Sequence, residues 1–304
     1  MRVPLYGWPG GPLAEGTSAS DPEQAGGPGQ SDDKLRFTVV VPTLNQGETI
    51  EDTLRSILEQ DYGNVEIIVA DGGSSDGTAA VLERYRHRLA RVIEGPDRGQ
   101  SDAINKGFRF ASGDILCWLN SDDYFLPGAL RHVANRFAAD PQVRFVVGAG
   151  DVISKDHKFL RHIPALPMTE ATLLNWKNDH WVMQQCCFWS RSLWREAGGV
   201  DEDLHLLMDY DLWFRLSRAT EAAVIEEKLA VMRYYPDVKT VRHRSKVSEE
   251  LAYVYAKNAV FGALREQVAE LVATHSSLQA RLGLIESSLP VRLLKRLSLF
   301  PTAS

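Results

Sequence analysis

The first half of the chain alternates short apolar runs, rich in β-branched residues, with segments of helical periodicity. The apolar runs occupy residues 37–41, 65–70, 91–94 and 114–119, and the helical segments occupy 48–60, 78–89 and 101–111. Such an alternation predicts strands that are joined by helical crossovers and therefore run parallel. We expect an α/β fold with a Rossmann-like, mostly parallel sheet flanked by helices.

Each of the four apolar runs is followed directly by polar or turn-forming residues. These segments are Pro42–Asn45, Asp71–Gly77, Asp97–Gln100 and Asn120–Asp123. In an open parallel sheet, ligands bind in the crevice beyond the carboxyl ends of the strands. The sequence therefore predicts a single ligand site built from four loops.

Charge and cysteine content narrow the class of protein. The chain has 34 Lys and Arg against 40 Asp and Glu, a formal net charge of -6, which argues against a nucleic-acid partner. Its 3 cysteines (Cys117, Cys186 and Cys187) fit neither a disulfide framework nor a zinc site. No apolar run is long enough to cross a bilayer. We expect a protein of the reducing cytoplasm.

The loop Asn120–Asp123 places two adjacent carboxylates after an apolar strand. Side chains alternate along extended chain, so one carboxylate can face the ligand while the other turns into the protein. A single carboxylate together with phosphate oxygens and water suits Mg²⁺ or Mn²⁺. The alternative is a turn whose acids cap the segment before Pro127.

The loop Asp71–Thr78 combines one strand-end carboxylate with a flexible, glycine-rich backbone. The Asp71 carboxylate can accept hydrogen bonds from a uracil ring N–H or a ribose hydroxyl, and Asp76 or Thr78 can cap the following helix. A simple glycine-rich turn between strand and helix is the alternative. The lack of a GxGxxG sequence counts against a nicotinamide dinucleotide site.

Four motifs in this order resemble the family 2 glycosyltransferases of GT-A fold: residues 39–45, 71–78, 99–107 and 120–123. The resemblance covers about residues 36 to 130 and continues more weakly to about 245. It implies an inverting, metal-assisted transfer of a sugar from a nucleotide diphosphate sugar, with UDP as the nucleotide. The acceptor would be a hydroxyl of a glycan or of a lipid-linked molecule, in the synthesis of a cell-envelope polysaccharide or glycoconjugate.

The resemblance also implies a domain organisation. Residues 1–34 form a disordered Gly/Pro-rich leader, and residues 35–245 form the GT-A domain. Within that domain, 35–130 would hold the nucleotide sugar and 131–245 the acceptor. Residues 246–304 are expected to be a helical extension.

Positional matching to the family assigns the donor contacts. The nucleotide-sugar contacts would be Pro42, Thr43, Asn45, Asp71, Arg98, Gln100, Ser101, Asn120, Ser121 and Asp122. Asp122 matches the last carboxylate of the family's DxD metal motif and would hold Mn²⁺ or Mg²⁺. The first carboxylate of that motif is replaced here by Asn120, which can still accept a hydrogen bond.

The segment 207–215 resembles the family's Glu-Asp-x-Asp-Leu-Trp-x-Arg helix start. Met208 replaces the Glu, and Asp209 takes the position of the base that deprotonates the acceptor hydroxyl. Asp211 lies two residues on and points elsewhere on a helix. Alternatively, both acids favour a helix N-terminus electrostatically.

Two further segments are assigned by composition and resemblance. Trp181, Gln184 and Gln185 suit an acceptor sugar, because aromatic faces stack on sugar rings and amides bind hydroxyls, although core packing is equally compatible. Arg242 and Lys246 belong to a cationic segment expected to close over the diphosphate. His243 between them would be a metal ligand or a structural residue.

The end of the chain is basic and amphipathic, with Leu293, Leu294, Leu297 and Phe300 beside basic residues. It would rest on an anionic membrane at the inner face, on the GT-A domain, or on another copy of the chain.

Two other functions remain open from the sequence. One is a nucleotidyltransferase of similar fold. The other is a non-catalytic nucleotide-sugar-binding module, which the replacements at Asn120 and Met208 keep in view. The sequence names neither the donor sugar nor the acceptor.

Overall fold

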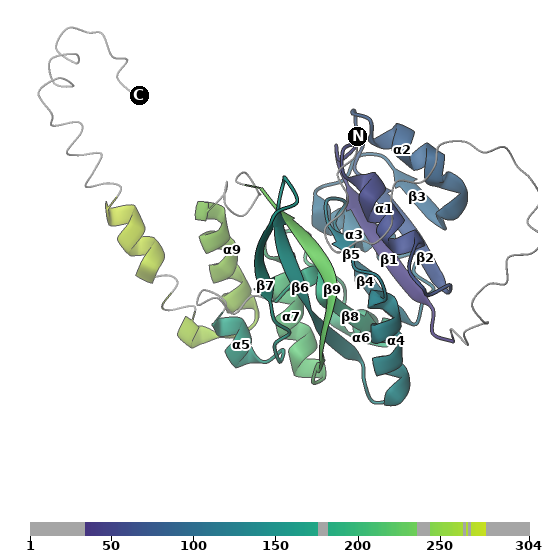
Figure 1. Cartoon of the computed structure of the whole chain (residues 1–304). Helices are drawn as coiled ribbons and strands as arrows, with labels where there is room; N and C mark the ends of the chain where they lie inside the picture. Colours follow the sequence, from purple (N-terminus) through teal and green to yellow (C-terminus); the bar gives the residue numbers. More distant parts are fainter. Residues whose placement is uncertain (1–33, 176–181, 236–243, 264–265, 267–268, 278–304) are drawn as a thin grey trace, which may run out of the picture. The chain divides into compact units, whose positions relative to one another are not determined.

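A computed structural model describes residues 34–175, 182–235, 244–263, 266 and 269–277 (Figure 1). The chain separates into two compact units, Met1–Arg242 and His243–Ser304. The expected leader (1–34) and the basic amphipathic end lie outside the described residues, apart from Lys34.

The first unit is a nine-stranded sheet with helices on both faces (Figure 1). Its strands are β1 (Phe37–Thr43), β2 (Val65–Asp71), β3 (Arg91–Glu94), β4 (Ile115–Trp118), β5 (Tyr124–Phe125), β6 (Phe145–Ser154), β7 (Phe159–Ile163), β8 (Cys187–Ser190) and β9 (Ala223–Tyr234). Its helices are α1 (Ile50–Leu58), α2 (Thr78–Tyr85), α3 (Gln100–Phe108), α4 (Ala129–Ala139), α5 (Glu170–Leu174), α6 (Arg191–Ala197) and α7 (Met208–Ala219). The strand order is β3-β2-β1-β4-β8-β6-β9-β5, and β7 pairs with β6.

The first four strands are parallel to their neighbours, as the alternation of strands and helices predicts. β1 continues through Pro42 to Thr43, one point where the expected strand end was wrong. The reason is local: β4 pairs with β1 only as far as Val40. The amide that Pro42 lacks would have faced the side that β4 has already left, so no ladder hydrogen bond is lost.

The second half of the unit joins this sheet through antiparallel pairs. β8 lies between β4 and β6 and is antiparallel to both, and β6 is parallel to β9. β6 is a strand of 10 residues and β9 a strand of 12 residues. The stretch 151–189, which shows no regular pattern in sequence, contains the end of β6 and all of β7, α5 and β8.

The two faces of β1 bury different cores. Phe37, Val39 and Val41 belong to the main hydrophobic cluster, which also contains Ile50 and Leu54 of α1. Val40 faces α3 so closely that a Cβ on Gly107 would lie 2.4 Å from Val40 Cγ1. The sheet is therefore packed on both sides, with α1 and α4 covering one face and α3, α6 and α7 the other (Figure 1).

An aromatic cluster fixes α7 against the sheet. The Trp213 ring stacks on Trp118 with centroids 6.1 Å apart and meets Trp189 edge-on at 5.8 Å. All three rings are almost fully buried. Burial of such large rings is among the strongest contributions to core stability, so α7 is held rigidly at Trp213.

The second unit contains α9 (Arg244–Lys257) and further helical residues up to 277 in its described part. The helix is interrupted at Ala259, whose φ of 55° is left-handed. No helix among the described residues is long and apolar enough to cross a membrane.

Replacing Phe188 by Ala tests the main core. Phe188 is fully buried and its ring contacts those of Phe37 and Phe125. We expect Phe188→Ala to lower the free energy of unfolding by about 3–5 kcal/mol in urea denaturation followed by circular dichroism. The control is Phe110→Ala, at a half-exposed ring stacked by Arg91, which should cost less than about 1 kcal/mol. Equal losses would contradict the assignment of this core.

Candidate active site

The predicted polar loops meet at one edge of the sheet. Thr43, at the end of β1, lies beside Asp71 at the end of β2. On the other side of β1, Leu119 N donates to Val40 O at 2.9 Å, so the loop that begins at Asn120 follows directly. Because neighbouring strands are about 4.8 Å apart, Asp71 and Asn120 flank β1 at a lateral separation of about 10 Å.

The loops after β1 and β2 are tied together by side chains. Asn45 has a φ of 53°, a left-handed conformation that Asn tolerates better than most residues. Its backbone N–H donates to Ser74 Oγ at 2.8 Å, and its Oδ1 accepts from Ser75 N at 2.8 Å. Asp71 Oδ1 accepts from the Ser74 hydroxyl at 2.6 Å. Ser74 thus brings the two predicted contacts, Asn45 and Asp71, into one network.

Asp76 locks the base of the same two loops. Its carboxylate accepts from Thr78 Oγ1 at 2.5 Å and from Gly47 N at 2.9 Å. The hydrogen bond from Thr78 is the main reason that the pKa of Asp76 lies below its ordinary value. The N-cap residue of α2 is Gly77, which has no side-chain cap, and Asp76, one residue earlier, accepts from the first helical amide, Thr78 N, at 2.9 Å.

Thr43 presents an open hydrogen-bonding position in this network. Its side chain is almost fully buried, yet among the described residues Oγ1 has no partner. A buried hydroxyl without a partner is costly, so a polar atom from a ligand suits this place. Leu44, the next residue, is exposed and offers an apolar surface beside it.

Gln100 and Asn120 connect the third and fourth loops. Gln100, the first residue of α3, donates from Nε2 to Asn120 Oδ1 at 2.8 Å. Asn120 in turn donates from Nδ2 to Asp123 Oδ2 at 3.3 Å. The amide that replaces the first carboxylate of the metal motif therefore relays hydrogen bonds, which an Asp could not do in the donating direction.

The two adjacent carboxylates point in different directions. Asp123 is buried and accepts from Gln185 Nε2 at 2.5 Å and from Arg233 N at 2.9 Å. Burial, and then the charge of Asp122, raise the pKa of Asp123 to about 8. Asp122 is only half-buried.

Arg233 on β9 is the residue that sequence reasoning missed. Its side chain is almost fully buried and donates to the Asp122 carbonyl at 2.8 Å and to Asp52 Oδ2 at 2.7 Å. The guanidinium also lies over the Tyr124 ring at 5.1 Å. One signal was present in the sequence, a single Arg within the apolar run of residues 229–235.

The donor set at Asp122 fits a hard divalent cation that is shared with a diphosphate. Burial, and then the charge of Asp122, raise the pKa of Tyr235 to about 12. No group of three or more His, Cys, Asp or Glu in the described part of the chain could hold a metal by itself. A cation here would need oxygen ligands from the substrate and water.

Asp209 and Asp211 on α7 have contrasting surroundings. Asp209, the second residue of the helix, is half-buried. Asp211 is fully buried and accepts from Arg215 Nε and Nη2 at 3.0 and 2.8 Å. Asp211 is therefore committed to the interior of the protein.

Two buried cysteines, Cys186 and Cys187, lie at the start of β8 beside the glutamines that support this edge. Burial raises the pKa of the Cys187 thiol well above its usual value, and the charges of Cys186 and Asp209 add to this rise. Cys187 lies two residues after Gln185, whose amide binds Asp123. The start of β8 is therefore linked to Asp123 through Gln185.

The remaining predicted residues are placed as follows. Gln184 is buried, donates to Trp118 O at 2.9 Å, and has no hydrogen-bond partner at Oε1 among the described residues. Both glutamines thus support the edge of the sheet from inside. Lys246 is exposed on α9 of the second unit. Trp181, Arg242 and His243 lie outside the described residues. Pro42 is buried in β1, and the Ser121 carbonyl accepts from Thr49 Oγ1 at 2.9 Å.

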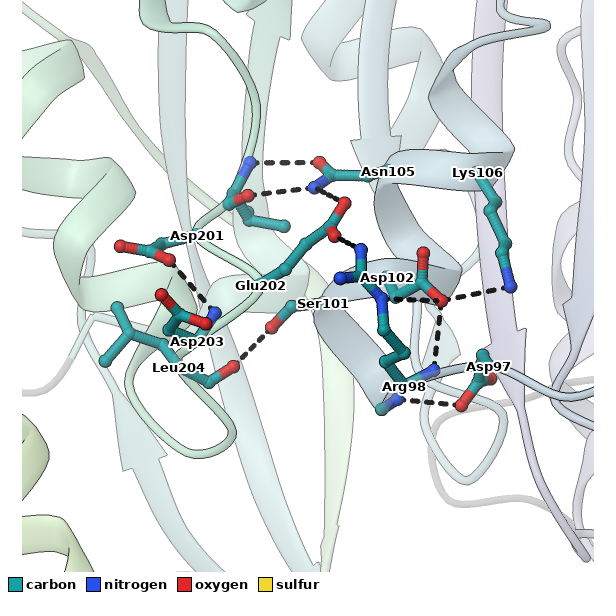
Figure 2. Close-up of polar contacts among 12 residues, drawn as sticks. Asp97, Arg98, Ser101, Asp102, Asn105, Lys106, Asp201, Glu202, Asp203 and Leu204 are labelled. Carbon is teal, nitrogen blue, oxygen red and sulfur yellow. Dashed lines mark hydrogen bonds and ion pairs between the residues drawn. The ribbon is translucent and has the colours of Figure 1, made fainter.

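Arg98 and Ser101, two other predicted donor contacts, are engaged by the loop before α7 (Figure 2). Arg98 forms an ion pair with Glu202 through its exposed guanidinium. Ser101 is buried, and its hydroxyl donates to Leu204 O at 2.5 Å. In this structure both side chains therefore join α3 to the second half of the unit.

A family profile matches the part of the chain that builds this edge. The profile described as Glycosyl transferase family 2 matches residues 38–197, more than half of the chain. The chain therefore belongs to glycosyl transferase family 2.

Curated relatives agree with this assignment. Uncharacterized protein MT1568 of Mycobacterium tuberculosis is 30% identical over 227 residues, which are 69% of this chain and 70% of the relative. Uncharacterized glycosyltransferase RC0461 of Rickettsia conorii is 25% identical over 209 residues, 66% of this chain. The match spans only 34% of the length of the Rickettsia protein.

Solved structures show the same fold. TarS (1–349) of S. aureus superposes with a TM-score of 0.61 at 16% identity, covering 85% of this chain and 78% of TarS. The mannosyltransferase PcManGT of Pyrobaculum calidifontis gives a TM-score of 0.56 at 22% identity, covering 85% and 82%. The architecture is the GT-A fold of glycosyltransferases, as the resemblance in sequence predicts.

Replacing Asp123 by Asn tests the buried carboxyl group. A folded-state pKa of about 8, above the ordinary value of about 4, means that folding retains a proton that the unfolded chain releases. The contribution of the protonated Asp123 carboxyl group to the stability of the folded protein is complete below about pH 4 and is lost as pH rises through about 8. In urea unfolding of metal-free protein, Asp123→Asn should therefore gain stability relative to wild type between about pH 5 and about pH 8.

The matched control is Asp156→Asn, at an exposed carboxylate in the turn between β6 and β7. Its stability relative to wild type should change little over the same pH range. A constant difference between Asp123→Asn and wild type would show that Asp123 is ionised in the folded protein.

Proposed function

We propose that the protein is an inverting glycosyltransferase that moves a sugar from a UDP-sugar to a hydroxyl of a glycan or lipid-linked acceptor. The observation that supports this proposal is the gathering of the loops after β1, β2 and β4 at one edge of the sheet, in a chain of glycosyl transferase family 2. A half-buried carboxylate and a loop suited to a metal-bound diphosphate are the two parts that such a transfer needs.

The donor loops support a nucleoside diphosphate. Asp71 and the unpartnered Thr43 hydroxyl offer polar atoms for a base or ribose, and Leu44 offers an apolar contact. Proteins of similar fold have been solved with such donors: TarS with UDP or UDP-GlcNAc, and PcManGT with GDP-Man and Mn²⁺. UDP is preferred here because the motif resemblance favours it.

The chemistry assigned to this site is a single displacement. The acceptor oxygen attacks the anomeric carbon of the sugar while Asp209 takes the hydroxyl proton, and the bond from that carbon to the diphosphate oxygen breaks. The configuration at the carbon is inverted and UDP leaves. A divalent cation held by Asp122 and the diphosphate would neutralise charge on the leaving group.

Asp209 suits the role of base better than Asp211 does. Asp211 is fully buried and its Oδ2 accepts two hydrogen bonds from Arg215, so this carboxylate has no access to an acceptor hydroxyl. Because Asp209 is half-buried at the start of α7, it can reach an acceptor hydroxyl without rearrangement of the core.

The organisation of the chain follows from this proposal. Residues 35–130 would bind the donor and 131–245 the acceptor, in the assembly of a cell-envelope polysaccharide or glycoconjugate. The cationic residues Arg242 and Lys246 would close over the diphosphate. The basic end of the chain would meet the inner face of the membrane, where lipid-linked acceptors reside, or a second copy of the chain.

A change of the base tests the transfer directly. Asp209→Asn keeps the shape of the side chain but cannot accept the proton, so the release of UDP from a turned-over donor should fall at least about 100-fold. The dissociation constant for the donor, measured by calorimetry, should change less than about twofold. Asp203→Asn, at an exposed carboxylate in the preceding loop, is the control and should retain activity. Full activity of Asp209→Asn would refute the role of this residue.

A thermal-shift panel of UDP-, GDP- and dTDP-sugars, with and without Mn²⁺, identifies the donor. A ligand at about 100 times its dissociation constant stabilises the native state by about 2.7 kcal/mol, so the true donor should raise the melting temperature by several degrees. Asp122→Asn should remove the part of this rise that depends on Mn²⁺. If a UDP-sugar raised the melting temperature equally with and without Mn²⁺, the assignment of Asp122 as the metal ligand would be wrong.

A further inference from the structure

The helix α3 presents two polar faces at the active edge. Gln100 points to the loop that carries Asp122, through its hydrogen bond to Asn120. Ser101 and Asn105 are four residues apart and therefore share another face. That face holds the loop that leads into α7 (Figure 2).

Asn105 binds one residue of this loop, Val200, at two points. Its Oδ1 accepts from Val200 N at 3.1 Å, and its Nδ2 donates to Val200 O at 2.9 Å. Nδ2 also donates to Glu202 Oε1 at 3.0 Å. A side-chain amide that pairs with both groups of one residue fixes its position and its orientation together.

The backbone before Val200 is shaped for this clamp. Gly198 and Gly199 have φ values of 78° and 88°, which side chains rarely adopt. A Cβ on Gly199 would lie 2.7 Å from Asn105 Oδ1, so only glycine allows the approach. The chain therefore turns sharply after α6 and is pressed onto Asn105.

Three more contacts continue the attachment toward α7. Ser101 Oγ donates to Leu204 O at 2.5 Å, and Leu204 N bonds to Asp201 O at 3.2 Å. Arg98 forms an ion pair with Glu202 of the same loop. The Arg98 side chain is exposed to solvent, so this pair contributes little to stability by itself. The half-buried bonds of Asn105 to Val200 and the buried bond of Ser101 to Leu204 therefore define the latch.

The middle of α7 and its first turn are held by different contacts. Its middle is fixed in the core by Trp213, and Arg215 Nη1 bonds to Ala197 O at 2.5 Å. Its first turn, with Asp209, begins four residues after Leu204, the last point of the latch. Within the first turn, the buried Tyr210 donates from its hydroxyl to Leu173 O. Loss of the latch would therefore leave α7 folded, but the loop before Asp209 would no longer be tied to α3.

We propose that Asn105 is a positioning residue which, with Ser101, sets Asp209 at the distance from the donor that the transfer requires. This inference rests on the proposed function. Because α3 also carries Gln100, one rigid helix contacts both the donor loop and the loop before the base. The helix therefore sets the distance between them. A displacement of about 1 Å in such a geometry can cost about 100-fold in rate.

The test is Asn105→Ala, assayed by UDP release from the UDP-sugar that the thermal-shift panel selects. We expect kcat to fall about 10- to 100-fold while the donor dissociation constant changes less than about twofold. Ser101→Ala should give a smaller fall of the same kind. The matched control is Ser190→Ala, which removes the N-cap hydrogen bond to Leu193 N at 3.2 Å on the opposite edge of the sheet. It should lower the melting temperature comparably and leave kcat unchanged.

Two outcomes would overturn the proposal. One is an unchanged kcat in Asn105→Ala, and the other is a donor dissociation constant that weakens in proportion to the loss of rate. Failure of the proposed function is distinguishable, because wild-type protein would then release no UDP from any donor in the panel. If Asp209→Asn is inactive and Asn105→Ala is fully active, the base stands and only the latch is wrong.

Discussion

The buried side chain of Arg233 is the interaction on which the active edge depends. It joins α1, through Asp52, to the carbonyl of Asp122, while its own backbone N–H binds Asp123. These partners are separated by more than 100 residues from Arg233 in the chain. Removing one member of such a buried network leaves charged groups without partners, which costs more than the net worth of the bonds. The donor loop is therefore built by the second half of the domain as much as by the first.

The same dependence explains which parts could be predicted from sequence. Strands 37–41 and 65–70, and the polar loops that follow them, are visible because a parallel βα pattern is local and repeats. β8 is four residues long and begins after a 3₁₀ turn, so no periodicity marks it. Its place between β4 and β6 is set by long-range pairing. The antiparallel half of the sheet therefore could not be predicted from local sequence patterns.

Residue roles at the site divide in a similar way. The motifs predicted that Asp71, Asn120 and Asp122 would gather at one edge, since strand ends of a parallel sheet meet there. They did not show that the amides of Asn120 and Gln185 would both bind Asp123. A residue's partner across the fold decides whether a carboxylate keeps its charge, and that partner is invisible in a single sequence.

The pairing of a rigid helix with two loops also bears on how the domain tolerates change. In the proposed function, donor recognition would lie on the loops after β1, β2 and β4, and the base would lie on a helix that is anchored by Trp213 in the core. If α3 sets the spacing between them, the donor loops can vary in sequence without moving Asp209. Variation at Asn105 or Gly199 would instead alter the spacing itself. A shorter side chain at 105 could not reach Val200, and a Cβ at 199 would collide with Asn105. Specificity and catalytic geometry are then set by separate residues of one edge, which is what lets one fold serve many sugars.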